Sequence, residues 1–300
     1  MQSGIYVPLI TPMLSTLAID YRSLDQLTNA YINQGVAGIV FGGDSSEIST
    51  LTDEEIAKIL GYLTAICSDN TSIIMDVSSD SLNITKKLIS IANDKNIKNI
   101  LVTITPFISE NQYELYVVIE QLANLYQGNI IVNINDSKIS PQIEVLRKIS
   151  KIKNVIGLAD DLTDINKLSF YKRKLVKIDN VINNNDSKIT LLHGESSISL
   201  ISNLATIIPA TIAKATRIAT TNISAANNIL DKYQKINYAF TLDQYPAIIK
   251  YVLHSLKITQ PYLRMPLKQL NAWQSTEIDK ILLDLYKHNI GEELTYENQL

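Results

Sequence analysis

The stretch Asn154-Val155-Ile156-Gly157-Leu158-Ala159-Asp160 decides the fold of this chain of 300 residues. It is a short apolar run that ends in a turn, and a helix-like segment over residues 141–151 precedes it. A run of this length with β-branched residues is typical of a buried strand. The same alternation of short apolar runs with helix-like segments extends along the chain in both directions, and it predicts the architecture.

Eight apolar runs are predicted as strands, at residues 5–10, 38–41, 72–75, 99–104, 129–133, 155–158, 189–192 and 210–213. Helix-like segments between them cover residues 21–34, 52–67, 81–94, 112–126, 141–151 and 196–204. Thr52 is expected to cap the start of its helix. Eight strand–helix units in series favour the α/β class and a TIM (β/α)8 barrel. The alternative is an open, doubly wound sheet, which is weakened because no glycine-rich dinucleotide turn follows the first strand.

The chain continues with further helices after the eighth unit, from Tyr238 to about His288, and Pro261 and Pro266 mark a connection within them. We therefore predict a barrel over residues 1–235 and a C-terminal helical appendage over residues 236–300, packed on the barrel as one structural unit. The polar tract Asn183-Asn184-Asn185-Asp186 is interpreted as a surface loop before the seventh strand.

Composition excludes several classes of protein. A net charge of −3 does not suggest a nucleic-acid partner. No apolar stretch approaches the roughly 18 residues that a membrane span needs, and the N-terminus lacks the pattern of a signal peptide. Cys67 is the single cysteine, so it cannot form an internal disulfide. These features predict a cytoplasmic protein that needs neither a disulfide nor a metal to fold.

Several segments together resemble the dihydrodipicolinate synthase / N-acetylneuraminate lyase family, over about residues 4–288. The stretch from Asn154 to Asp160 resembles the sixth barrel strand of that family. Leu9-Ile10-Thr11-Pro12-Met13 is similar to its first strand, Gly42-Gly43-Asp44-Ser45-Ser46-Glu47 to its Gly-Thr-Thr-Gly-Glu loop, and Leu263-Arg264-Met265-Pro266 to its Leu-Arg-Leu-Pro-like turn. The order and spacing of these segments imply a barrel and an activity of the pyruvate-dependent, aldolase-type lyases.

The resemblance also implies where a site would lie, and the chain departs from the family there. The family's Schiff-base lysine corresponds to Ala159, and the tyrosine of its fifth strand corresponds to Val132, with Asn133 next to it. The threonine pair of the first loop corresponds to Asp44 and Ser45, which are candidate substrate-binding residues.

Two more family positions are changed. The arginine that holds a carboxylate in the family's synthases corresponds to Ser137, with Lys138 one step later, and both are candidate substrate-binding residues. A second tyrosine of the family falls near Phe107-Ile108, where neither side chain has a hydroxyl. Ser46 replaces the loop glycine, so we expect the loop backbone to be restricted there.

Schiff-base chemistry needs a neutral amine at the reacting carbonyl, and the methyl group of Ala159 cannot supply one. The sequence therefore predicts a non-catalytic or repurposed paralogue. The alternative is an active lyase or aldolase of altered chemistry that uses Lys214, predicted to close the eighth strand beside Thr211, a further candidate substrate-binding residue. The lysine can equally be an ordinary solvent-facing side chain.

A divalent cation at the barrel mouth is the other form of this alternative, because carboxylates are hard oxygen ligands. Acidic residues follow several predicted strands: Asp44, Glu47, Asp76, Asp136, Asp160, Asp161 and Glu195. Capping of helix N-termini explains such residues without any metal, and no cofactor is predicted. The expected partners are a small 2-oxo acid or a related metabolite. A second copy of the chain is also expected, in a dimer or tetramer, through the loop at Thr105-Pro106-Phe107.

Overall fold

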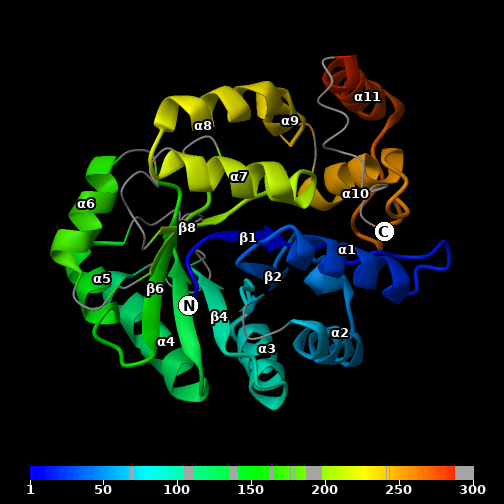
Figure 1. The fold of residues 1–300 in the computed structure, drawn as a ribbon. Helices are drawn as coiled ribbons and strands as arrows, with labels where there is room; N and C mark the ends of the chain where they lie inside the picture. The colour runs from blue at the N-terminus through cyan, green and yellow to red at the C-terminus, as the bar shows by residue number, and fades with distance from the viewer. Residues whose placement is uncertain are drawn as a thin grey trace.

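The computed structural model describes residues 1–67, 71–104, 111–134, 141–162, 165–175, 178, 180–186, 198–240, 242 and 244–287. Eight parallel strands form a closed barrel in sequence order, and β8 pairs with β1 to complete it (Figure 1). The strands are β1 (Ile5–Pro8), β2 (Gly38–Gly42), β3 (Ser72–Asp76), β4 (Asn99–Thr103), β5 (Asn129–Asn133), β6 (Val155–Asp160), β7 (Asn180–Asn183) and β8 (Ile198–Ile201). The predicted TIM barrel is confirmed.

Helices cover the outside of the barrel (Figure 1). They are α1 (Tyr21–Asn33), α2 (Asp53–Ile66), α3 (Leu82–Asp94), α4 (Gln112–Leu125), α5 (Ile143–Ile149), α6 (Ile165–Lys174) and α7 (Pro209–Ala219), and α8 (Ile223–Leu230) packs against α7. The chain ends in α9 (Gln234–Ala239), α10 (Tyr245–Ser255) and α11 (Ala272–Lys287). The predicted C-terminal helices are therefore present. No helix of the described residues is both long enough and apolar enough to cross a membrane.

Local chemistry explains where α2 begins. The Thr52 hydroxyl accepts from the Glu55 N–H at 3.2 Å, and the Glu55 carboxylate accepts from the Thr52 N–H at 3.0 Å. This reciprocal capping box satisfies two N–H groups that a helix start leaves without partners. The expected cap at Thr52 is confirmed.

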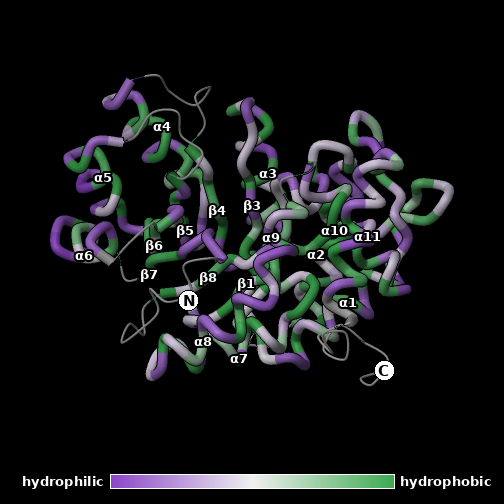
Figure 2. The backbone as a smooth tube through the Cα atoms, turned by 90° about the horizontal axis from the view of Figure 1, so that it is seen from above, coloured by the Kyte–Doolittle hydropathy of each residue, from purple (hydrophilic) through white to green (hydrophobic). Residues whose placement is uncertain are grey.

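The core has two layers, because side chains of a strand alternate between the two faces of the sheet. The inner layer fills the barrel with Tyr6, Ala37, Val40, Ile74, Leu101, Ile131, Ala159 and Ile182. The outer, larger layer lies between the strands and the helices. Seen from above, the strands are largely hydrophobic, whereas the helices alternate between hydrophobic and hydrophilic segments (Figure 2). The barrel is thus a packed core whose polar groups lie at its ends.

The last two strands differ from the prediction. Residues 210–213, predicted as the eighth strand, lie in α7, which starts with Pro209 at a favoured first position. The small and apolar residues of this segment form the buried face of a helix, not a strand. Residues 196–204 were predicted as a helix, but Ile198–Ile201 is β8. The seventh strand is Asn180–Asn183; residues 189–192, where it was expected, lie outside the described residues.

Candidate functional site

A chain of neutral polar groups lies at the carboxyl ends of β4 to β7, where barrel enzymes carry their sites. Thr103 of β4 pairs in register with Asn133 of β5, and Asn133 pairs with Ala159 of β6. The Asn133 amide donates to the Thr103 hydroxyl at 3.1 Å, and the Asn184 amide donates to the Asn133 amide oxygen at 3.3 Å. We call Thr103, Asn133 and Asn184 the amide cluster. It surrounds the end of β6 with hydrogen-bonding groups that carry no charge.

Ala159 is fully buried and packs in the inner layer of the core with Ile131 and Ile182. Its backbone pairs with Asn133 on one side and Ile182 on the other. The position predicted from the resemblance therefore faces the interior at the carboxyl end of the barrel. Because its side chain is a methyl group, it can neither attack a carbonyl nor move a proton.

Val132 does not lie with Ala159. Its side chain is fully buried in the outer layer of the core, between the sheet and the helices, whereas Ala159 belongs to the inner layer. Neighbouring residues of a strand point to opposite faces, so Val132 faces away from the barrel axis while Asn133 faces toward it. The structure thus brings together two of the candidate residues, Asn133 and Ala159, and separates the third.

The loop after β2 carries Asp44 and Ser45 in a conformation that two glycines permit. Gly42 has φ 120° and Gly43 has φ 62°. A Cβ at Gly42 would lie 2.1 Å from the Asp76 carbonyl oxygen, and one at Gly43 would lie 2.5 Å from the Asp76 carboxylate. Only glycine fits this close approach of β2 and β3. The loop is thereby held against the end of β3.

Ser46 is built into this loop rather than strained by it. Its hydroxyl donates to the Leu9 carbonyl at 2.6 Å and accepts from the Gly42 N–H at 2.8 Å, while the Thr11 hydroxyl donates to its carbonyl at 2.7 Å. Ser46 is fully buried, and its φ is not positive; the neighbouring Glu47 has the left-handed conformation, with φ 55° and ψ 34°. Ser46 therefore has a backbone conformation that is open to residues with a Cβ atom, and the left-handed position of the loop is the next residue, Glu47.

A cleft of about 560 Å³ opens beside this loop, above the ends of β2, β3 and β4. Gly43 and Asp44 line one part of it, and Thr103, a member of the amide cluster, lines another. The remaining lining residues come from the segments after β2 and β3 and from α2 and α3: Ile48, Ser49, Leu51, Asp53, Ile56, Asp76, Ser78, Ser79, Asp80, Ile84, Lys87 and Leu88. Carboxylates and serine hydroxyls dominate its polar wall. The lysine of the wall, Lys87, pairs with Asp53 at 2.6 Å. Such a wall suits a ligand that carries hydroxyl groups or a positive charge.

Among the acidic residues expected at the barrel mouth, Asp44 and Asp76 line the cleft, and the other described ones have separate partners. The Asp160 carboxylate accepts from the Tyr171 hydroxyl at 2.6 Å and pairs with Lys167 at 2.7 Å. Asp161 accepts from the Asn185 amide at 2.6 Å.

Glu47 forms a buried ion pair with Lys250. Asp136 and Glu195 lie outside the described residues. Within the described part of the chain, no group of three His, Cys, Asp or Glu residues is arranged to hold a metal ion. The described residues therefore give no support to a divalent cation at the mouth.

Lys214 is not at the end of a strand. It lies in α7, its side chain is exposed, and Thr211 is buried one turn before it in the same helix. The predicted placement of both residues at the barrel mouth is wrong, because the segment is a helix on the outside of the barrel. Ser137, Lys138 and the Phe107-Ile108 pair lie outside the described residues.

Three polar residues of this region were not singled out as site residues from the sequence: Thr103, Asn184 and Asp186. For Asn184 and Asp186 the signal was present in the tract Asn183-Asn184-Asn185-Asp186, which begins with the last residue of β7 and lies at the carboxyl end of the barrel rather than before a seventh strand. Asp186 accepts from the Leu204 N–H at 3.1 Å, and burial raises the pKa of its carboxyl to about 6. It links the ends of β7 and β8.

Known proteins resemble this chain over nearly its whole length. The profile of the dihydrodipicolinate synthetase family matches residues 1–285. The 4-hydroxy-tetrahydrodipicolinate synthase of Fervidobacterium nodosum is 27% identical over 282 residues, which cover 92% of this chain and 95% of that protein. The enzyme of the same name from Wigglesworthia glossinidia brevipalpis is 27% identical over 294 residues, covering 94% and 96%.

Solved structures agree on the fold. Dihydrodipicolinate synthase from Aquifex aeolicus superposes with a TM-score of 0.84 at 20% identity, covering 96% of this chain and 98% of that one. The enzyme from Acinetobacter baumannii, solved with pyruvate, gives a TM-score of 0.84 at 22% identity, covering 95% and 99%. The family profile extends from β1 into α11, so the match includes the C-terminal helices as well as the barrel. The chain belongs to the dihydrodipicolinate synthetase family.

Proposed function

We propose that this chain binds a small polar metabolite at the carboxyl end of its barrel and does not form a Schiff base with it. The observation that carries the proposal is Ala159, a buried methyl group at the inner face of β6, where the resemblance implies a lysine. Without an amine at this point, a 2-oxo acid has no nucleophile to meet there. On this proposal the protein is a non-catalytic or repurposed member of a lyase family.

The surroundings of Ala159 favour binding over covalent chemistry. Asn133 and Thr103 offer an amide and a hydroxyl, which hydrogen-bond a ligand without changing charge. The cleft beside them has a volume within the range of small-molecule sites, and Asp44 belongs to its wall. A lyase that uses Lys214 instead is not favoured, because that lysine is exposed on an outer helix.

The first test is reductive trapping with pyruvate, because a relative was solved with pyruvate. The protein is incubated with pyruvate and sodium borohydride, and its intact mass is measured. We expect no mass increase from the native protein. An adduct that peptide mapping assigns to one lysine would overturn the proposal, and its loss in the Lys214→Ala variant would assign the chemistry to that side chain.

Binding itself needs a separate measurement. Thermal unfolding is followed with and without pyruvate and a panel of hydroxylated and cationic metabolites at millimolar concentration. A ligand of the native state raises the melting temperature by mass action. The matched control is Asp44→Asn, which removes one charge from the cleft wall and should abolish the shift of a cationic ligand only. If neither pyruvate nor any hydroxylated or cationic metabolite shifts the melting temperature, the binding proposal is wrong.

Assembly and organisation complete the proposal. We infer a homo-oligomer, a dimer or tetramer, and sedimentation of the purified protein tests it against a monomer. One solved relative is described as a monomeric dihydrodipicolinate synthase variant, so a monomer is a real alternative outcome. The division into a barrel over residues 1–235 and an appendage over residues 236–300, and a cytoplasmic location, are parts of the same proposal.

A further inference from the structure

Lys250 of α10 and Glu47 of the loop after β2 form an ion pair in which neither side chain has any exposed surface. The Lys250 ammonium also donates to the Tyr262 carbonyl at 2.7 Å. Burial raises the pKa of Glu47 and lowers the pKa of Lys250, and each partner opposes the shift of the other. A buried pair of this kind stabilises little by itself, but either charge alone would be costly. The pair is therefore better explained as a contact that fixes the position of Glu47 relative to α10.

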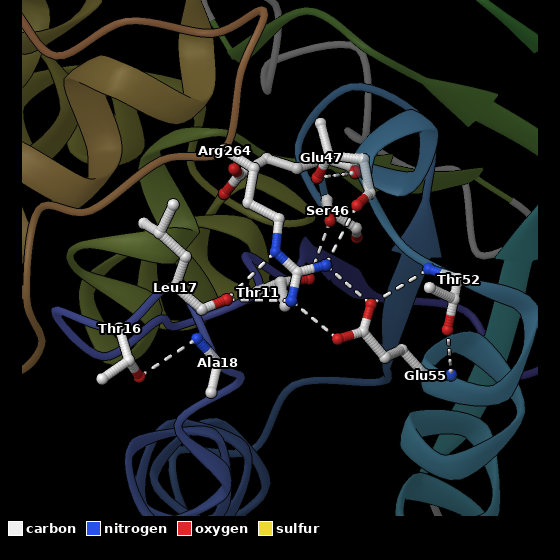
Figure 3. Close-up of polar contacts among 10 residues, drawn as sticks. Thr11, Thr16, Leu17, Ala18, Ser46, Glu47, Thr52, Glu55 and Arg264 are labelled. Atoms are coloured by element: carbon white, nitrogen blue, oxygen red, sulfur yellow. Dashed lines mark hydrogen bonds and ion pairs between the residues drawn. The ribbon is translucent and has the colours of Figure 1, made fainter.

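Arg264, which follows α10, contacts the same region from a second point (Figure 3). Its guanidinium forms two hydrogen bonds with the Glu55 carboxylate, both 2.6 Å long. It also donates to the Thr50 carbonyl at 3.0 Å and to the Leu17 carbonyl at 2.8 and 3.0 Å. A planar guanidinium that meets a carboxylate in this bidentate way fixes direction as well as distance. One side chain thus joins the loops after β1 and β2 to the first turn of α2.

The segment between these contacts is the wall of the cleft. Residues 43–51, which we call the cleft loop, include Gly43, Asp44 and Ile48 of the lining. Glu47 has a left-handed backbone conformation, which is unfavourable for a residue with a Cβ atom. Such a conformation persists where its surroundings over-determine it. Here the surroundings are the Lys250 ammonium and the hydrogen bonds of Arg264.

We propose that Lys250 and Arg264 are positioning residues: the C-terminal helical segment, through Glu47 and Glu55, sets the conformation of the cleft loop and so the shape of the cleft. The barrel strands supply the floor of the cleft, and a segment from the other end of the sequence fixes its wall. These contacts exist in the protein without ligand, so their role can be tested whether or not the protein binds a metabolite.

Hydrogen exchange of individual amides tests this in the full-length protein. The main variant is the double substitution Glu47→Gln with Lys250→Met, which removes both charges and leaves no buried charge without a partner. If the pair positions the loop, the amides of Glu47, Ile48 and Thr50 exchange at least about tenfold faster than in the wild type, because local opening becomes easier. Amides of β4 and β5 stay within about threefold. A pair that served stability alone would leave the loop amides as unchanged as those of the strands.

Two further variants complete the design. Arg264→Lys keeps the positive charge of a partly exposed side chain but loses the bidentate contact, and it should accelerate exchange of the Thr50 and Leu51 amides. Lys235→Met is the matched control: it breaks an exposed ion pair with Asp284 between α9 and α11 and should leave the cleft loop unchanged. Loop exchange within threefold of the wild type in either the double variant or Arg264→Lys overturns the proposal. If the double variant does not fold, Arg264→Lys decides alone.

Discussion

Ser46 lies in the loop after β2, at a position where the resemblance implies a glycine. The Ser46 hydroxyl satisfies two buried backbone groups, the Leu9 carbonyl at 2.6 Å and the Gly42 N–H at 2.8 Å. Each buried group that loses its partner costs about 1–3 kcal/mol. The two losses share one site and are not fully additive, so we expect Ser46→Ala to lower the free energy of unfolding by about 2–4 kcal/mol.

Ser46→Gly should cost more than Ser46→Ala. Because φ at Ser46 is not positive, glycine relieves no strain in the folded state, and it gains conformational freedom in the unfolded chain, which adds about 0.5–1 kcal/mol. The substitution that returns the residue of the resembling family is thus expected to be the more harmful of the two.

Urea unfolding followed by far-ultraviolet circular dichroism measures both effects, and the dependence on urea must stay the same for the comparison to hold. The control is Ser45→Ala in the same loop, whose hydroxyl contacts the Gly42 carbonyl at 3.5 Å and is half-buried; it should cost less than about 0.5 kcal/mol. A loss below about 0.5 kcal/mol for Ser46→Ala, with an unchanged urea dependence, would refute the hydrogen-bond account of this loop.

Three other predictions concern single positions. Burial raises the pKa of Asp186 to about 6, so the folded state binds more protons than the unfolded state between about pH 4 and pH 6. The free energy of unfolding should therefore fall by about 1–3 kcal/mol as pH rises through that window. The urea midpoint of the Asp186→Asn variant should not show this decrease. Burial raises the pKa of the Cys67 thiol to about 11, so at pH 8 its reaction with a disulfide reagent should be about 100-fold slower than that of an exposed thiol; a rate within tenfold would contradict the burial. A Cβ at Gly38 would lie 2.4 Å from the Tyr6 ring and 2.3 Å from the Ser72 carbonyl oxygen, so Gly38→Ala should lower the melting temperature by more than about 6 °C. Calorimetry measures the melting temperature, and a smaller decrease would contradict the prediction.

The sequence predicted the barrel and its first six strands to within about two residues at each end, since each is a continuous apolar run bounded by turn residues. It missed β7 and β8 for a physical reason. In β7 only Val181 and Ile182 are apolar, and asparagines at both ends read as loop. In α7 the small residues around Ile212 and Ala213 fit the buried face of a helix as well as a strand, and only Pro209 marks the start.

The site was predicted less completely, because its residues meet through the barrel and not along the chain. Asn133 and Ala159 were named from the resemblance, and the register of β5 and β6 places them side by side. The outward direction of Val132 follows from that same register, which no local pattern shows. Lys250 and Glu47 lie far apart in the sequence, and Glu47 was named only as one of the acidic residues of the barrel mouth, so no local pattern predicts their contact.

Fold and chemistry are separable at the end of β6. Leu158 fills the outer layer of the core, and Gly157 is favoured because a Cβ there would make tight contacts with the Asn180 carbonyl oxygen at 3.1 Å and Ile131 at 3.3 Å. Neither demand involves the residue at position 159, where a methyl group also spares the barrel a buried amine and its desolvation. The strand can therefore keep the packing that identifies the family whatever its last inward side chain does. This is why the stretch from Asn154 to Asp160 predicts the fold so well, and why the function must be argued from the groups around it.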